Sequence, residues 1–159
     1  MSTSKITPFL WFDFIGTQAV DFYASVFKDF KRGAIVPYGF GQPGPEGEPM
    51  TIEFSILGQD FVALNGGPDF KFNESVSFAI NCKTQDEIDY YWEKLPANGG
   101  KTSVCGWVSD KFGLAWQINA SALDDMLKNG DSAQRSRVMQ AMLKMKKLDI
   151  AALKAAYAG

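Results

Sequence analysis

The chain contains no histidine, and this limits the kinds of side chain that could carry out catalysis. That absence removes Ser-His-Asp and Cys-His pairs, together with the commonest metal ligand and proton shuttle. Chemistry must come from carboxylates, thiols, amides, tyrosines, lysines or a bound cofactor. Glu53 lies mid-strand on a polar face, and it is the candidate catalytic base if that face lines a pocket. If the face points to solvent, Glu53 is an ordinary surface residue.

The two cysteines are the candidate nucleophiles. Cys105 precedes Gly106 and Trp107, and a reactive thiolate there would need a cationic neighbour such as Lys101 or Lys111. The alternative is a packed free thiol, because unpaired cysteine behaves as a small apolar side chain. Cys82 is expected in the core, on the helix side of its strand. In an unexported chain both cysteines are expected to be free thiols, although the sequence does not exclude a disulfide between them.

Alternation in residues 51–57 predicts the strand that positions Glu53. Thr51, Glu53 and Ser55 share one face and apolar residues the other, as in a half-buried strand. Gly58, Gln59 and Asp60 are interpreted as a turn that leads into a hairpin partner. The other elements of this half are strands over residues 6–13, 31–38 and 61–65 and a helix around residues 19–27.

The second half of the chain repeats the first. Residues 20–23 (VDFY) match residues 88–91 (IDYY) at an offset of 68, and residues 63–65 (ALN) match residues 117–119 (QIN) at an offset of 54. The second copy has its own expected elements. They are strands over residues 75–82, 104–109 and 114–119 and a helix over residues 86–95. The repeat predicts two β-α-β-β-β units, each with one helix covering the outer face of a small sheet.

We therefore predict an α+β fold in which paired βαβββ modules form one cup-shaped domain. Module one spans about residues 5–67, module two about residues 74–120, and a helical tail follows over residues 121–159. The free inner faces of both sheets line the cup, and the parity of the repeat turns Asn65 and Gln117 inward. The predicted pocket residues are Glu53, Asn65, Ser77, Cys105, Trp107 and Gln117, with Trp107 as a flat apolar wall.

Composition limits the classes of partner. The chain has 159 residues, 46% of them hydrophobic and 21% charged, which is typical of one globular domain. Its net charge of −2 supplies no field that favours nucleic acid or an anionic membrane. No apolar run is long enough to span a bilayer, and the N-terminus lacks the apolar stretch of a signal peptide. These features predict a cytoplasmic protein that binds neither nucleic acid nor membrane.

The tail over residues 131–159 is mildly basic, with six Lys or Arg against two Asp. Its Met139, Met142 and Met145 follow one another at helical spacing. This stripe indicates packing against the sheets or against a second subunit. The alternative is a partner-binding helix.

Several separate blocks of the sequence resemble one known family. They are ITPFLWFD, AVDFYASVF, ALNGGPDFKFNESVSF, YYWEKL, CGWVSDKFGLAWQI and RVMQAMLKMKKLDIAAL. Together they are similar to the PhnB-like branch of the vicinal oxygen chelate superfamily, which has the glyoxalase, bleomycin-resistance and dioxygenase fold. Members often carry the description 3-demethylubiquinone-9 3-methyltransferase. The resemblance implies paired βαβββ modules around a cup, and a homodimer.

Metal-dependent members of this superfamily take one ligand, mostly His or Glu, from the first and last strands of each module. The resemblance implies ligand positions within residues 6–9 and at Ala63, Ser77 and Gln117. None of these offers a charged donor, and a divalent metal there would lack the charge and basicity that its affinity requires. We therefore expect no metal site and no cofactor.

Three functions follow from these observations and the resemblance. The first is binding of a small, partly apolar or aromatic molecule in a metal-free cup. The second is an enzyme of the superfamily, of lyase, isomerase or dioxygenase type, that uses Glu53 or an atypical metal site. The third is methyl transfer, as the family description suggests. S-adenosylmethionine commonly needs a glycine-rich turn after the first strand, and the turn at residues 13–18 has one glycine.

Overall fold

A computed structural model describes residues 5–159 and divides the chain into two compact units. The first ends at Phe72, and the second comprises Asn73–Gly159. The N-terminal stretch that we interpreted as lacking a signal peptide lies largely outside the described residues. Within residues 5–159, no helix has both the length and the apolar character needed to cross a bilayer.

The first unit is a four-stranded sheet with one helix. Its elements are β1 (Phe9–Phe12), α1 (Gly16–Val26), β2 (Phe30–Pro37), β3 (Pro49–Ile56) and β4 (Gln59–Asn65). The strand order is β1-β4-β3-β2, with β1 parallel to β4 and the other pairs antiparallel. The predicted β-α-β-β-β module is therefore confirmed.

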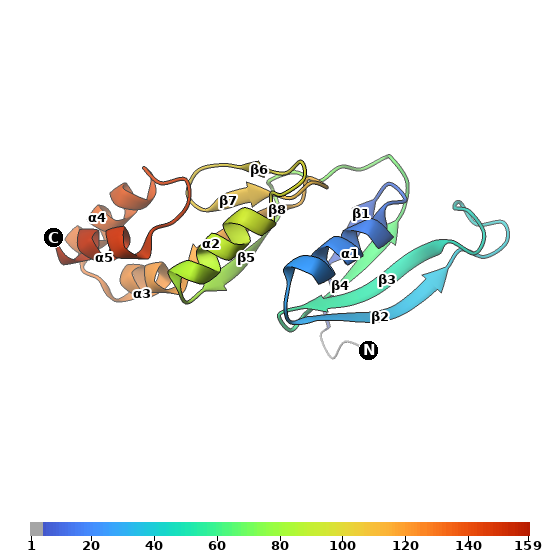
Figure 1. Ribbon diagram of the computed structural model, residues 1–159, viewed down its shortest axis with the longest axis horizontal. Coiled ribbons are helices and arrows are strands. Elements are labelled where there is room, and N and C mark those ends of the chain that lie inside the picture. The colour runs from blue at the N-terminus through green and yellow to red at the C-terminus, as the bar shows by residue number, and fades with distance from the viewer. Residues whose placement is uncertain (1–4) are drawn as a thin grey trace. The chain divides into compact units, whose positions relative to one another are not determined.

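Helix α1 covers one face of this sheet (Figure 1), and aromatic side chains pack between them. The helix buries Ala19, Val20 and Tyr23 at helical spacing. The ring of Tyr23 stacks on Phe54 of β3 at a centroid distance of 5.9 Å, and Phe54 stacks on Phe61 of β4 at 5.4 Å. This core fixes which strand positions face the helix, so the alternate positions form an open face.

The second unit repeats the same topology. Its elements are β5 (Ser77–Cys82), α2 (Gln85–Lys94), β6 (Lys101–Thr102), β7 (Trp107–Ser109) and β8 (Ala115–Ala120). The strand order β5-β8-β7-β6 is equivalent to the order β1-β4-β3-β2 of the first sheet. Strand β6 has only two residues, too few to produce a visible alternation in the sequence. The predicted pair of βαβββ modules is thus confirmed, and a cup lined by both sheets stays a prediction.

Three tail helices belong to the second unit. They are α3 (Ser121–Asn129), α4 (Ser132–Met142) and α5 (Ile150–Ala158), and Figure 1 shows them gathered at one end of the second sheet. Asp131 and Asp149 accept hydrogen bonds from backbone N–H groups in the first turns of α4 and α5. Such capping satisfies N–H groups that a helix start leaves without partners.

Candidate functional site

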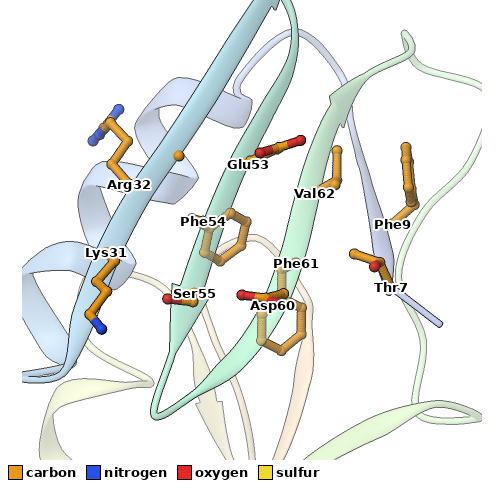
Figure 2. A pocket seen from close by; sticks show the side chains of 11 residues that line it. Thr7, Phe9, Lys31, Arg32, Glu53, Phe54, Ser55, Asp60, Phe61 and Val62 are labelled. Atoms are coloured by element: carbon orange, nitrogen blue, oxygen red, sulfur yellow. The ribbon is translucent and has the colours of Figure 1, made fainter. Parts of the chain in front are cut away.

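The open face of the first sheet holds a groove of about 390 Å³. Its floor consists of two rows of side chains that cross neighbouring strands, as Figure 2 shows. One row is Lys31, Ser55 and Asp60, and the next is Glu53, Val62 and Phe9. The groove combines an aromatic wall with a few charged and hydroxyl groups, the usual composition of a small-molecule site.

Glu53 lies opposite an irregularity in β2. Arg32 pairs with Phe54, and Ile35 pairs with Ile52. Two residues of β2, Gly33 and Ala34, therefore lie opposite the single residue Glu53 of β3. This arrangement is a β-bulge, a feature that often re-aims side chains near functional sites. A β-carbon on Gly33 would lie 2.7 Å from the Glu53 Cβ, so glycine leaves the space that Glu53 occupies.

Charges in the groove are only partly matched. Arg32 pairs with Asp21 of α1, outside the groove, whereas Lys31 lies in the groove beside Ser55. Among residues 5–159, the carboxylates of Glu53 and Asp60 form no ion pair. Glu53 is therefore available to a ligand in the groove, either as a hydrogen-bond acceptor or as a base.

Asn65 lies on the helix side of the first sheet, and its predicted inward orientation is wrong. Its side chain is buried, with 4% exposure. Its Oδ1 accepts a hydrogen bond from the Gly16 N–H at 2.8 Å, and its Nδ2 donates to the Pro49 carbonyl at 2.8 Å. Asn65 thus joins the start of α1 to the sheet instead of lining a pocket.

The cause of this error is the register of the closing strands. In the first module Phe9 pairs with Val62. The equivalent of Phe9 at the repeat offset of 68 is Ser77, and Ser77 pairs with Ala115. The closing strands are therefore related by 53 residues, not 54, and a one-residue slip moves every side chain to the opposite face. The counterpart of Gln117 is Leu64, whereas Ala63 faces α1.

The structure brings together three of the predicted residues on the open face of the second sheet. Gln117 of β8 donates from Nε2 to the Ser77 Oγ of β5 at 2.8 Å. Trp107 of β7 lies directly opposite Gln117. A groove of about 450 Å³ runs past Trp107, and it is also lined by Lys101, Ser103 and Ser109.

Cys105 is held against the tail. It has a left-handed backbone conformation, with φ of 56°, in the turn before β7. Its N–H donates to the Met145 carbonyl at 2.8 Å, and its Sγ lies 3.7 Å from the Met142 carbonyl oxygen. Its part in a ligand pocket stays a prediction.

Cys82 is a core residue on the helix side of β5, as predicted, with 1% exposure. Burial raises the pKa of its thiol to about 12, and Glu87 adds to the increase. Cys82 and Cys105 are both free thiols.

Comparison with known proteins defines the family. The family described as 3-demethylubiquinone-9 3-methyltransferase matches residues 4–119. The chain belongs to this family. The PhnB protein from Bacillus cereus is 30% identical, and the alignment covers 74% of this chain and 99% of that protein with a TM-score of 0.66. No curated protein matches the chain.

More distant solved structures share the fold of this family member. A Pseudomonas aeruginosa protein is 20% identical, with 74% of this chain and 98% of that protein covered and a TM-score of 0.59. The fosfomycin resistance protein FosX from Listeria monocytogenes, solved with Mn(II) and 1S,2S-dihydroxypropylphosphonic acid, is 17% identical. That alignment covers 81% of this chain and all of FosX with a TM-score of 0.52. The expected glyoxalase and bleomycin-resistance fold is confirmed.

The residues at the ligand positions that the resemblance implies do not fit a divalent metal. After the register correction, which replaces Ala63 by Leu64 and pairs Phe9 of the 6–9 window with Val62, these positions hold Phe9, Leu64, Ser77 and Gln117. Two of these side chains are apolar and two are polar but uncharged, whereas protein sites for zinc or manganese are built mainly from imidazole, thiolate or carboxylate donors. Within residues 5–159, no three His, Cys, Asp or Glu side chains form a cluster suited to a metal ion.

Sequence reasoning missed the part of the first groove around Asp60. The turn is at Leu57 and Gly58, and β4 already begins at Gln59, so Asp60 is a strand residue opposite Ser55. The alternation of Asp60, Val62 and Leu64 was the available signal. The turn-like composition of residues 58–60, with Gly58 followed by Gln59 and Asp60, concealed it. Lys31 was also missed, because only the hairpin register places it in the row of Ser55.

Proposed function

We propose that the protein binds a small, partly apolar organic molecule on the open faces of its sheets without a divalent metal. The observation that carries this proposal is the neutral hydrogen bond between Ser77 and Gln117. It is formed at two positions where the family resemblance implies metal ligands. The aromatic walls Phe9 and Trp107 support the proposal, because each lies in a groove with a few polar groups.

Metal analysis combined with a binding titration tests this proposal. The purified chain is incubated with Mn²⁺ or Zn²⁺, desalted and subjected to elemental analysis. Naphthalene is then titrated while tryptophan fluorescence is followed, with and without EDTA. We expect little retained metal and saturable binding that EDTA does not change. About one tightly held metal ion per chain, or binding that requires the metal, would contradict the proposal.

Catalysis by Glu53 is the second candidate function, favoured by the bulge that seats its carboxylate in the first groove. The protein would then be a lyase, isomerase or dioxygenase-type enzyme in which Glu53 accepts a proton from the ligand. Glu53→Gln should keep the affinity for a turned-over compound and abolish its turnover, and Ser55→Ala is the control on the same strand face. Unchanged turnover in Glu53→Gln would exclude this role.

Methyl transfer, which the family description names, is the weakest candidate. The N–H of Gly16, at the start of α1, is occupied by the Asn65 side chain. Most strand pairs are antiparallel, unlike the alternating parallel fold that commonly binds S-adenosylmethionine. The residues present therefore do not fit this cofactor. An increase in melting temperature with S-adenosylmethionine would reverse this conclusion.

We also propose that the protein is cytoplasmic and forms a homodimer. Two free thiols suit a reducing compartment. Ile35 and Val36 are about half exposed on the edge strand β2, and exposed apolar edges are commonly covered by another chain. Light scattering should give a mass of roughly twice 17.5 kDa. A monomer mass would contradict the dimer.

A further inference from the structure

The open face of the second sheet carries a row of three side chains suited to one kind of ligand. The Ile118 N–H donates to the Gly106 carbonyl at 2.8 Å, so Trp107 and Gln117 form a non-hydrogen-bonded pair between antiparallel strands. Side chains of such pairs approach closely, with Cβ atoms about 4.5–5.5 Å apart. The indole of Trp107 therefore lies beside the amide of Gln117, which Ser77 holds from the other side.

The Ser77–Gln117 pair keeps hydrogen-bonding capacity after its internal bond is formed. Gln117 retains its Oε1 acceptor and a second N–H, and Ser77 retains its O–H donor. These groups are uncharged at every physiological pH. They complement a ligand that presents a carbonyl beside an N–H or O–H, and each group left unpaired after desolvation would cost binding energy.

The charges that line the adjacent groove cancel. Glu74 and Lys101 both line it, together with the hydroxyls of Ser103 and Ser109. The groove therefore has no excess charge that would select an ionic ligand. Trp107 is only half-buried, so its ring presents a flat apolar surface to the groove.

We infer that Trp107, Gln117 and Ser77 recognise a flat, uncharged ring that carries a carbonyl beside an N–H or O–H donor. The ring lies against the indole, and its polar edge meets the amide and hydroxyl. This inference rests on the proposed function and adds the chemical class of the ligand. It assigns a role in neutral hydrogen-bond recognition to Ser77 and Gln117, the two polar residues at positions where the resemblance implies metal ligands.

A matched pair of probes tests this assignment. Quinolin-2(1H)-one has two fused flat rings, one of which carries a lactam. Naphthalene has nearly the same two-ring shape but no polar atoms. Both are titrated into the full chain with calorimetry. We expect quinolin-2(1H)-one to bind at least about tenfold more tightly. Gln117→Leu should remove most of this preference, and Ser77→Ala should reduce it. Asn119→Leu, two residues further along the same strand face, should preserve it.

The possible outcomes separate the ligand class from the proposed function. Equal affinity for the two probes, or a preference that survives Gln117→Leu in a folded variant, would overturn the ligand class. In that case the binding of naphthalene would still support the proposed function. Binding of neither probe would overturn both. Trp107→Leu should weaken both probes together, because the indole contacts the ring surface that they share, and unchanged affinities would place the site elsewhere.

Discussion

The side chain of Glu53 occupies the space that a β-carbon on Gly33 would need. The 2.7 Å separation between this position and the Glu53 Cβ is below any ordinary carbon–carbon contact. Because the two residues lie on neighbouring strands at a bulge, neither can move away without a shift of β2 against β3. The glycine thus leaves the space in which Glu53, one of the carboxylates that line the first groove, is seated.

Gly33→Ala should therefore destabilise the protein by about 1–3 kcal/mol, as expected for an added methyl group without room. The smaller entropy loss of alanine on folding, worth about 0.4–1 kcal/mol, does not offset the collision. Urea denaturation measures the difference. Gly39→Ala is the matched control, because its methyl group would lie 3.7 Å from the nearest Gln42 atom. Equal stabilities for the two variants would contradict this account of Gly33.

Asn65→Ala should cost about 1–3 kcal/mol, because it leaves the Gly16 N–H and the Pro49 carbonyl without their partner. Chemical denaturation provides the measurement, and naphthalene affinity should stay unchanged. Asn81→Ala is the control, since Asn81 is an exposed residue of β5 and its loss should have little effect. Weaker binding of naphthalene by Asn65→Ala without loss of stability would contradict this structural role and indicate that Asn65 lines the pocket.

Cys82 should make the protein sensitive to alkali. The unfolded thiol loses its proton near its ordinary pKa of 9.0, whereas burial raises the native pKa to about 12. Between these values the native state binds more protons, so the free energy of unfolding falls as pH rises. Below pH 9.0 this contribution is fully present. Urea denaturation at about pH 8 and about pH 10 measures the fall.

The fall with pH should be smaller in Cys82→Ala than in the original chain, whatever the stability of the variant at the lower pH. Cys105→Ala is the control, and it should keep the original dependence. Identical pH dependences in the original chain and Cys82→Ala would show that Cys82 does not titrate in this way.

Gln85 fastens the tail to α2. Its Nε2 donates to the Leu148 carbonyl at 3.0 Å, and its Oε1 accepts from the Ile150 N–H at 3.0 Å. Gln85→Ala leaves both backbone groups unpaired and should cost about 1–3 kcal/mol. Hydrogen exchange should accelerate over residues 143–150 and remain slow in β5 and β8. Gln59→Ala, a change at an exposed glutamine, is the control, and unchanged exchange in Gln85→Ala would contradict this role.

The duplicated topology and the polar face of β3 were predictable from the sequence. Matching residues at offsets of 68 and 54 showed the repeat, and strict alternation showed which side of β3 carries Glu53. The orientation of Asn65 was not predictable in the same way. A strand's faces alternate at every residue, so the one-residue difference between offsets of 54 and 53 reverses the answer. Only the pairing of Phe9 with Val62 and of Ser77 with Ala115 decides between them.

The sequence by itself determined the classes of chemistry and the architecture. A chain without histidine and with two matching halves specifies paired βαβββ modules and limits side-chain chemistry to carboxylates, thiols, amides, tyrosines and lysines. The tertiary structure alone decided which side chains meet. The Ser77–Gln117 bond spans 40 residues of chain, and the Trp107–Gln117 pair depends on hairpin register. The local sequence determines the preferred secondary structure and which residues share a strand face. Contacts between strands depend instead on the register in which separate segments align.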